Sequence, residues 1–187
     1  LHDAYLSVAE AMNHAGYELN TFVKIHWIDS ETITKESVND ILKDLDGIIV
    51  PGGFGNRGIE GMILSAKYAR ENQVPYFGIC LGMQIAVIEF ARNVLGMKNA
   101  HSGEFDEQCE HKVIDFMPGQ SEKIDKGGTL RLGSYPCSIK AGTKMEQCYG
   151  ANLIYERHRH RYEFHNKYRE MMTDAGLVIS GTSPDDR

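Results

Sequence analysis

The chain has 187 residues, of which 42% are hydrophobic and 25% charged, and its formal net charge is −6. This composition is typical of a soluble globular protein, and the acidic balance argues against broad binding to a phosphate backbone. No apolar run approaches the roughly 18–20 residues of a membrane-spanning helix. We therefore expect neither nucleic acid nor membrane as a partner, and a small molecule or another protein instead.

The four cysteines (Cys80, Cys109, Cys137 and Cys148) show neither CxxC pairing nor the spacing of metal ligands. Nothing near the N-terminus resembles a signal peptide. Reduced thiols in a cytoplasmic protein are the simplest interpretation. Because the first residue is leucine rather than methionine, we expect the chain to be part of a longer polypeptide.

The first elements predicted are a helix and a strand. The helix begins after Asp3, which can cap it, and its inner face includes Leu6 and Met12. Residues 22–29, FVKIHWID, are rich in β-branched and aromatic side chains and predict a strand.

The next stretch alternates short apolar runs with helical patterns. We predict helices at 37–45 (capped by Glu36 or Ser37), about 58–72, and 81–95 (closed by Gly96), with strands at 47–50 and 76–79. Wholly apolar short strands that alternate with helices are typical of a parallel sheet covered on both faces. The first half therefore predicts an α/β fold.

After Gly96 the pattern changes to longer strand candidates. These are residues 113–116, 129–140, 151–164 and 177–182, with helices near 143–149 and 166–175 and a polar loop at 117–128. No repeat, low-complexity tract or linker interrupts them. We predict one domain over residues 1–187, α/β in class, with an antiparallel strand region in its C-terminal half.

A cysteine flanked by glycines stands where the strand at 76–79 meets the helix at 81–95. In Gly78-Ile79-Cys80-Leu81-Gly82 the glycines lie two residues on either side of Cys80. This is the cysteine counterpart of the Gly-x-Ser-x-Gly nucleophile elbow, a sharp turn in which a Cβ at either position would collide. The carboxyl end of a parallel strand is also where α/β proteins bind ligands.

The elbow places the sulfur over the first turn of a helix. Unpaired N–H groups and the helix dipole favour a thiolate there, and a thiolate attacks carbonyl carbon. Cys80 is therefore a candidate nucleophile for acyl transfer through a thioester. A lone cysteine is more often a small buried residue in a tight turn, and it is the glycine pair at this junction that favours the catalytic interpretation.

A second loop, Gly52-Gly53, follows the neighbouring apolar strand and should lie beside the elbow. The N–H groups of Gly53 and Leu81 could converge on a tetrahedral oxyanion, where a single donor is worth about 3 kcal/mol. Alone, this loop would be interpreted as an ordinary turn.

Five segments carry a resemblance to a known family, in this order and at these distances: PGGFGNRG, GICLGMQ, HSGEF, GGTLRLG and ERHRHRYEF. They resemble the glutaminase domain of CTP synthases, a class I (triad-type) glutamine amidotransferase. The resemblance implies a flavodoxin-like, mostly parallel sheet with helices on both faces. It also implies hydrolysis of L-glutamine to glutamate and ammonia, with no cofactor in this domain.

The resemblance further implies the role of the longer polypeptide, here called the parent protein, to which this chain would belong. Ammonia would pass to a synthetase domain of the same polypeptide, which converts UTP to CTP with ATP and Mg²⁺, is regulated by GTP, and forms a tetramer. Cys80 matches the nucleophile. Glutamine-binding positions match Gly53, Leu81, Gly82, Met83, Gln84, Glu104 and Arg161.

Two of these residues make chemical sense for free glutamine, which carries an α-ammonium and an α-carboxylate. Glu104 suits the ammonium, and Arg161 offers a bidentate fork for the carboxylate. Without the resemblance, Glu104 would be interpreted as a solvated loop charge.

The segment RHRHR permits other interpretations. On one continuous strand, Arg157, Arg159 and Arg161 would share one face, and His158 and His160 the other. A zinc site lacks further ligands at a standard spacing, and the acidic chain disfavours RNA. We expect one ligand-binding arginine among charges that serve structure or interdomain contact.

Two features depart from the family pattern. The family's catalytic base and its orienting carboxylate lie in a His-Pro-Glu segment, and none of the eight histidines here is followed by Pro-Glu. His158, His160 and His165 lie in the wrong segment, so we assign no base. The family also has a strand before the first helix. We expect flanking segments to be missing at both ends, and glutamine turnover by this stretch alone to be nearly absent.

Two other functions stay open. The chain could be a catalytically silent amidotransferase-like module that binds glutamine or a protein. It could also be a different cysteine hydrolase on the same architecture, such as a γ-glutamyl hydrolase, which would prefer peptide-linked glutamine to free glutamine.

Overall fold

A computed structural model describes residues 2–116 and 131–184. Contacts divide the chain into two compact units, residues 1–86 and 87–187, and each is described by itself. Within the described residues, no helix is both long and apolar enough to span a membrane. The prediction of a single domain over residues 1–187 stays a prediction.

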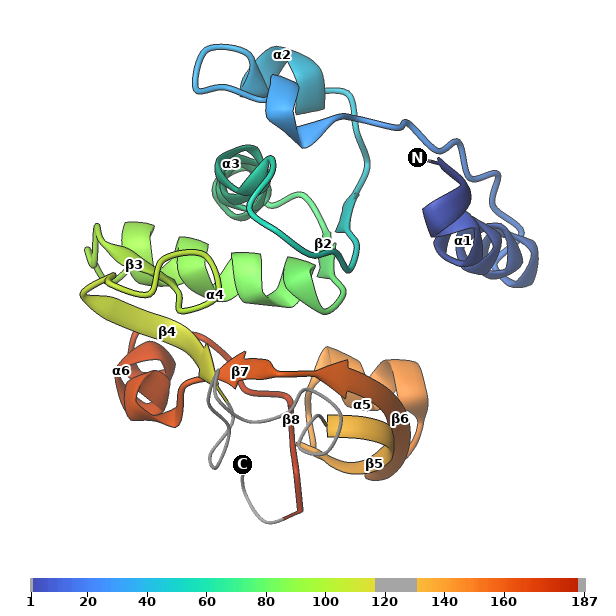
Figure 1. The fold of residues 1–187 in the computed structure, drawn as a ribbon. Coiled ribbons are helices and arrows are strands. Elements are labelled where there is room, and N and C mark those ends of the chain that lie inside the picture. Colours follow the sequence, from blue (N-terminus) through green and yellow to red (C-terminus); the bar gives the residue numbers. More distant parts are fainter. Residues whose placement is uncertain (1, 117–130, 185–187) are drawn as a thin grey trace. The chain divides into compact units, whose positions relative to one another are not determined.

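The first unit contains one parallel strand pair and the helices that follow each strand (Figure 1). Its elements are η1 (His2–Tyr5), α1 (Leu6–Glu18), η2 (Ser30–Thr32), α2 (Val38–Leu42), β1 (Ile48–Val50), α3 (Ile59–Glu71), β2 (Tyr76–Gly78) and the start of α4 (Leu81–Asn93). β1 and β2 run parallel, with Ile48 opposite Tyr76 and Val50 opposite Gly78. The predicted alternation of strand and helix is confirmed here.

The core of this unit forms where α2 and α3 cover the strand pair. Leu42, Ile48, Val50 and Ala69 are buried together. Fully burying an aliphatic side chain of the size of Leu or Ile contributes about 1.5–3 kcal/mol. Because β1 is anchored by two of these side chains, the loop that follows it starts from a fixed point.

The N-terminal predictions are partly wrong. Residues 22–29 run extended without a sheet ladder, because a strand needs a hydrogen-bonded neighbour and no described strand pairs with them. Phe22 is 90% exposed. α1 begins at Leu6, after a 3-10 turn, with no side-chain cap from Asp3, and Leu6 is exposed rather than on an inner face.

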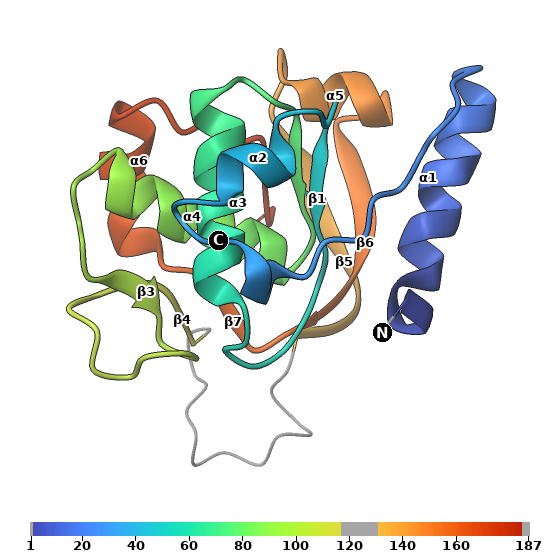
Figure 2. The same cartoon turned by 90° about the horizontal axis from the view of Figure 1, so that it is seen from above.

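The second unit holds two three-stranded sheets (Figure 2). Its elements are β3 (Ala100–Ser102), β4 (His111–Phe116), β5 (Arg131–Ile139), α5 (Lys144–Tyr149), β6 (Leu153–His160), β7 (Tyr162–Phe164), η3 (Asn166–Tyr168), α6 (Arg169–Asp174) and β8 (Gly181–Thr182). One sheet has the order β3-β4-β7 and the other β6-β5-β8. The predicted loop at 117–128 lies outside the described residues.

The mixed α/β class is confirmed, with parallel pairs β1–β2 and β3–β4 and antiparallel pairs β4–β7, β5–β6 and β5–β8. β3 was not predicted, and the strand expected at 177–182 is only two residues long. The strand expected at 151–164 is broken at Arg161, so β6 and β7 belong to different sheets.

This break corrects the prediction for RHRHR. Exposure alternates strictly along β6, with Arg157 and Arg159 outward and His158 and His160 inward. Arg161 stands in the bend between the two strands and is only part-exposed. It therefore does not share the outward face of the other two arginines.

Candidate active site

The turn at Cys80 leaves no room for a side chain at Gly78 or Gly82, so only glycine fits at these two positions. A Cβ built on Gly78 would lie 2.4 Å from the carbonyl carbon and oxygen of Gly82. A Cβ on Gly82 would lie 1.9 Å from the carbonyl oxygen of Val50, far inside van der Waals contact. The reason predicted for these two glycines is confirmed: the turn packs backbone against backbone.

Cys80 itself adopts a left-handed conformation, with φ of 56°. The two other non-glycine residues with positive φ in the described chain are Asn20 and Gln73, both in exposed surface turns. Asparagine tolerates this region and cysteine does not favour it. A strained residue at a strand–helix junction is the signature of a nucleophile elbow.

Hydrogen bonds tie the elbow to the neighbouring strand and to the helix. The Ile79 N–H donates to the Val50 carbonyl at 2.9 Å, and the Gln84 N–H donates to the Cys80 carbonyl at 3.2 Å. Cys80 therefore sits at the first turn of α4, where backbone N–H groups lack intrahelical partners. A negative charge on the sulfur is favoured at that position.

The loop after β1 lies against this elbow, as the sequence predicted. A Cβ on Gly52 would lie 3.3 Å from Cys80 Cβ and 3.9 Å from its Sγ. A Cβ on Gly53 would lie 3.2 Å from Leu81 Cδ2. The backbone of Gly52 and Gly53 therefore approaches Cys80 Cβ and the Leu81 side chain so closely that a Cβ at either glycine would be crowded.

The four residues after the cysteine differ in what they can present. Leu81 and Gln84 are 4% and 5% exposed, and Gly82 is also buried. Met83 is 42% exposed. Leu81 and Gly82 can therefore serve a ligand through backbone groups, whereas Met83 offers an accessible side chain.

Glu104 and Arg161 are brought together by β4, although 56 residues of sequence separate them. β4 lies between β3 and β7, parallel to the first and antiparallel to the second. The end of β3, Ser102, pairs with Ile114, and the start of β7, Tyr162, pairs with Phe116. Both charged residues therefore fall at the C-terminal end of β4.

The electrostatics of the pair suit a zwitterion. Burial raises the pKa of the Glu104 carboxyl above its ordinary value, and the nearby Arg161 charge partly offsets this. The two side chains sense one another, yet they do not form one of the ion pairs within 4.0 Å found in the described residues. An ammonium and a carboxylate of one ligand could bind between them.

One supporting residue was missed by the sequence reasoning. Ser102 is fully buried, and its hydroxyl accepts a hydrogen bond from the Glu104 N–H at 3.2 Å. It holds the backbone of Glu104 at the end of β3. Because β3 has only three residues and no strand-like alternation, the sequence carried no signal for it.

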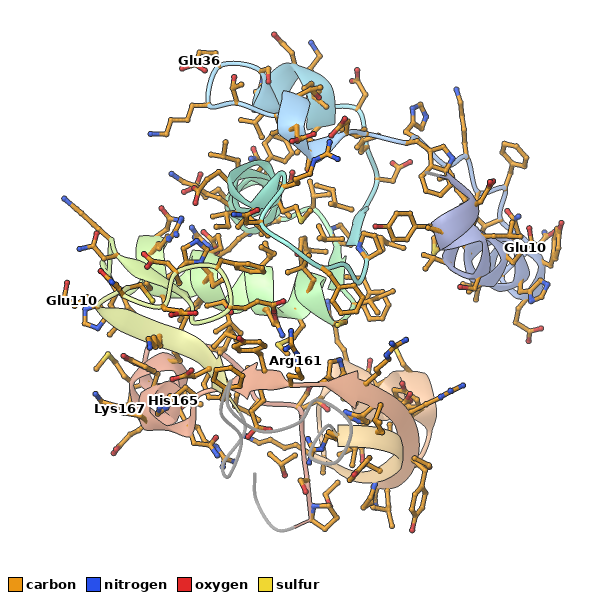
Figure 3. All side chains as sticks on the ribbon, viewed as in Figure 1. Glu10, Glu36, Glu110, Arg161, His165 and Lys167 are labelled. Atoms are coloured by element: carbon orange, nitrogen blue, oxygen red, sulfur yellow. The ribbon has the colours of Figure 1, made fainter. Side chains whose placement is uncertain are left out.

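The histidines in this unit have structural partners. His158 and His160 share a 3.3 Å contact between their Nδ1 atoms, and the Nδ1 of His165 accepts the Lys167 N–H at the start of η3. Arg161 precedes β7 and His165 follows it, so the two residues lie at opposite ends of the strand (Figure 3). Across the described part of the chain, no group of three His, Cys, Asp or Glu residues could hold a metal ion.

A cavity of about 450 Å³ lies elsewhere in the second unit, among β5, β8 and α6. Ile139, Lys140 and Arg169 contribute to its lining. None of the residues predicted for the site lines it. The candidate site residues themselves fall into two groups: the elbow with its glycine loop in the first unit, and Glu104 with Arg161 in the second.

Comparison with known proteins gives a consistent picture. Residues 1–187 match the family described as glutamine amidotransferase class-I. The whole chain is 62% identical to a CTP synthase of Listeria innocua and 57% identical to one of Clostridium acetobutylicum, covering 35% of each. Among solved structures it is similar to the Trypanosoma brucei CTPS glutaminase domain with bound acivicin, with a TM-score of 0.92, 40% identity, and coverage of 99% of this chain and 72% of that one.

The chain belongs to the class-I glutamine amidotransferase family and, within it, to the glutaminase domains of CTP synthases. It spans about a third of the length of the curated relatives that it matches.

Proposed function

We propose that this chain is the glutaminase part of a CTP synthase and hydrolyses L-glutamine to glutamate and ammonia. The observation that carries the proposal is the elbow: a left-handed Cys80 between two glycines that the fold requires, beside the loop at Gly52. A part-exposed cysteine at a helix start is suited to attack an amide carbon.

In the first step, Cys80 Sγ attacks the side-chain amide carbon of glutamine, forming a C–S bond and placing negative charge on the amide oxygen. The N–H groups of Gly53 and Leu81 are the proposed oxyanion donors, each worth about 3 kcal/mol. The C–N bond then breaks, and ammonia leaves after its nitrogen gains a proton. Water attacks the resulting thioester to release glutamate and restore the thiol.

The proton for the departing nitrogen must come from a general acid. His158, His160 and His165 have structural partners within the second unit, so we assign this role to none of them. The reaction proposed here is that of the whole polypeptide.

Recognition of free glutamine is assigned to Glu104 for the α-ammonium and to Arg161 for the α-carboxylate. Gly82, Met83 and Gln84 complete the proposed glutamine-binding set. Because both charges of the substrate need a counter-ion, this pair would favour free glutamine over a peptide-linked residue.

The relatives are named CTP synthases, which supports a role for the ammonia in forming CTP. We propose that a synthetase domain of the same polypeptide uses it to convert UTP to CTP with ATP and Mg²⁺, under control by GTP, in a cytoplasmic tetramer. The silent binding module and the γ-glutamyl hydrolase are the alternatives, and neither has a structural observation that favours it.

A labelling experiment on the parent protein tests the proposal. A glutamine-mimicking chloroketone should form one adduct, at Cys80, which free glutamine blocks and Cys80→Ala abolishes. Two other cysteines are internal controls, because burial raises the pKa of the Cys109 and Cys137 thiols and keeps them protonated. Adducts spread over the other cysteines would contradict the assignment.

Product analysis separates the alternatives. The parent protein should release ammonia from free glutamine, and Cys80→Ala should not. Labelling without ammonia release would favour the silent module, and faster cleavage of γ-glutamyl peptides would favour the hydrolase.

A further inference from the structure

Arg161 lies in an unusual place for a side chain that must present a fixed fork. It occupies the single-residue bend between β6 and β7, where no ladder fixes the backbone. Its guanidinium carbon lies 5.6 Å from the centre of the Tyr162 ring. A free arginine side chain loses rotamer entropy on binding, so a contact that orders it beforehand improves affinity.

The Tyr162 ring is itself held firmly. It is 7% exposed and stacks on Phe116, with ring centres 4.5 Å apart and planes inclined by 29°. The two residues are directly opposite in the antiparallel pair of β4 and β7. Cross-strand aromatic pairs of this kind fix ring orientation as well as stabilising the sheet.

We propose that Tyr162, braced by Phe116, is a positioning residue that orders the Arg161 guanidinium for the α-carboxylate of glutamine. The inference rests on the proposed function. Because the guanidinium carbon lies over the Tyr162 ring, the N–H groups that point away from the ring stay available for a bidentate pair with a carboxylate. β4 thereby supports both ends of the substrate, through Phe116 on the arginine side and through its pairing with β3 on the Glu104 side.

A second arginine in the same unit provides a matched control. Arg131 lies over the ring of Tyr135 with its guanidinium carbon 5.1 Å from the ring centre. Its charge is already paired with Glu163, at 3.9 Å. Loss of the Tyr135 ring removes the same type of contact from an arginine that has no proposed role in glutamine binding.

The experiment compares Tyr162→Leu, Tyr162→Phe and Tyr135→Leu in the full-length parent enzyme. Two substrates are used: L-glutamine, and its α-amide, in which a neutral amide replaces the α-carboxylate. For Tyr162→Leu we expect the KM for glutamine to rise about 10-fold with kcat changed less than about 2-fold, because uniform binding is lost. Tyr162→Phe, which keeps the ring, and Tyr135→Leu should stay within about 2-fold of wild type.

The α-amide separates positioning from general structural damage. It cannot use the carboxylate contact, so Tyr162→Leu should hydrolyse it with the same KM as wild type. CTP formation from added ammonium reports the amount of active synthetase domain, and the thermal midpoint reports whether the variant folds. If Tyr162→Leu does not fold, Phe116→Leu takes its place. For that variant we expect the KM for glutamine to rise about 3-fold and the KM for the α-amide to stay unchanged.

If Tyr162→Leu raised the KM equally for both substrates, or left the KM for glutamine unchanged, the inference would be overturned. A wild-type enzyme that makes CTP from ammonium and releases no ammonia from glutamine would overturn the proposed function, and this inference with it.

Discussion

The two groups of candidate site residues are specified in different ways. The elbow around Cys80 depends on close packing between Gly78 and the backbone of Gly82 and Met83, and on one neighbouring carbonyl, that of Val50. The Glu104–Arg161 pair depends on which strands flank β4 and in what register. A local backbone conflict leaves its mark in the sequence as glycines, whereas an electrostatic pair formed across a sheet leaves two ordinary charged residues.

This difference has consequences for mutation. The elbow should be intolerant of a single added methyl group, because backbone atoms cannot move out of its way. The charged pair should tolerate substitution structurally and lose only substrate affinity.

The largest effect is expected for Gly82→Ala. The new Cβ would lie 1.9 Å from the Val50 carbonyl oxygen, so β1 and α4 must separate or the turn must rearrange. We expect a loss of about 3 kcal/mol in the free energy of unfolding and no measurable hydrolysis of glutamine. Calorimetry and an ammonia assay on the parent enzyme measure the two effects.

Gly47→Ala is the control for that prediction. Its Cβ would meet nothing closer than 3.6 Å, and the residue is exposed at the start of β1. We expect stability within about 0.5 kcal/mol of wild type. Equal losses for the two variants would show that the elbow is not specially constrained.

The second prediction concerns Arg161→Lys. A lysine keeps the charge but loses the bidentate fork and the contact of the guanidinium with the Tyr162 ring. We expect the KM for glutamine to rise about 30-fold, corresponding to about 2 kcal/mol, while the thermal midpoint and ammonium-dependent CTP formation stay near wild type. A lysine variant with normal KM would remove the proposed role of the guanidinium.

The sequence predicted those features that depend on neighbours along the chain. The helix expected at about 58–72 forms at Ile59–Glu71, and the elbow lies where the glycines placed it. The sequence did not predict the break at Arg161, because the segment RHRHR alternates regularly. The strand ends there only because Tyr162 pairs in a different sheet from β6. The prediction of a strand at 22–29 was wrong for a related reason: residues with high strand propensity form a strand only where a neighbouring strand can pair with them, and no described strand does so here.

The third prediction concerns pH and Glu104. Burial raises the pKa of this carboxyl, so it loses its charge at a higher pH than an ordinary glutamate as the solution is acidified. Below that pKa it no longer attracts an ammonium, and the KM for glutamine should rise. Glu104→Gln should raise the KM about 10-fold at neutral pH. It should also abolish the acid limb of the profile, which is the rise in KM as the pH falls.

Arg161→Gln sharpens the same test. The Arg161 charge lowers the pKa of Glu104, so its removal should move the acid limb to higher pH. Steady-state kinetics across the acid range measures the limb. A limb that does not move would show that the two side chains are not coupled.

The smallest effect is expected for the histidine pair on the inner face of β6. Burial lowers the pKa of both His158 and His160, and the Arg131 charge lowers both further. His158 also lowers the pKa of His160, whereas Glu156 raises that of His158. The folded state thus binds fewer protons than the unfolded state just below the ordinary histidine pKa. Stability is therefore fully present above about pH 6.5 and is lost as the pH falls.

Replacing both histidines with asparagine should flatten this dependence. We expect the thermal midpoint of wild type to fall by a few degrees more than that of the double variant between pH 7 and pH 5. Calorimetry at a series of pH values gives the two slopes, and the difference between them is independent of any constant cost of the substitutions. Parallel slopes would mean that the pair titrates alike in both states.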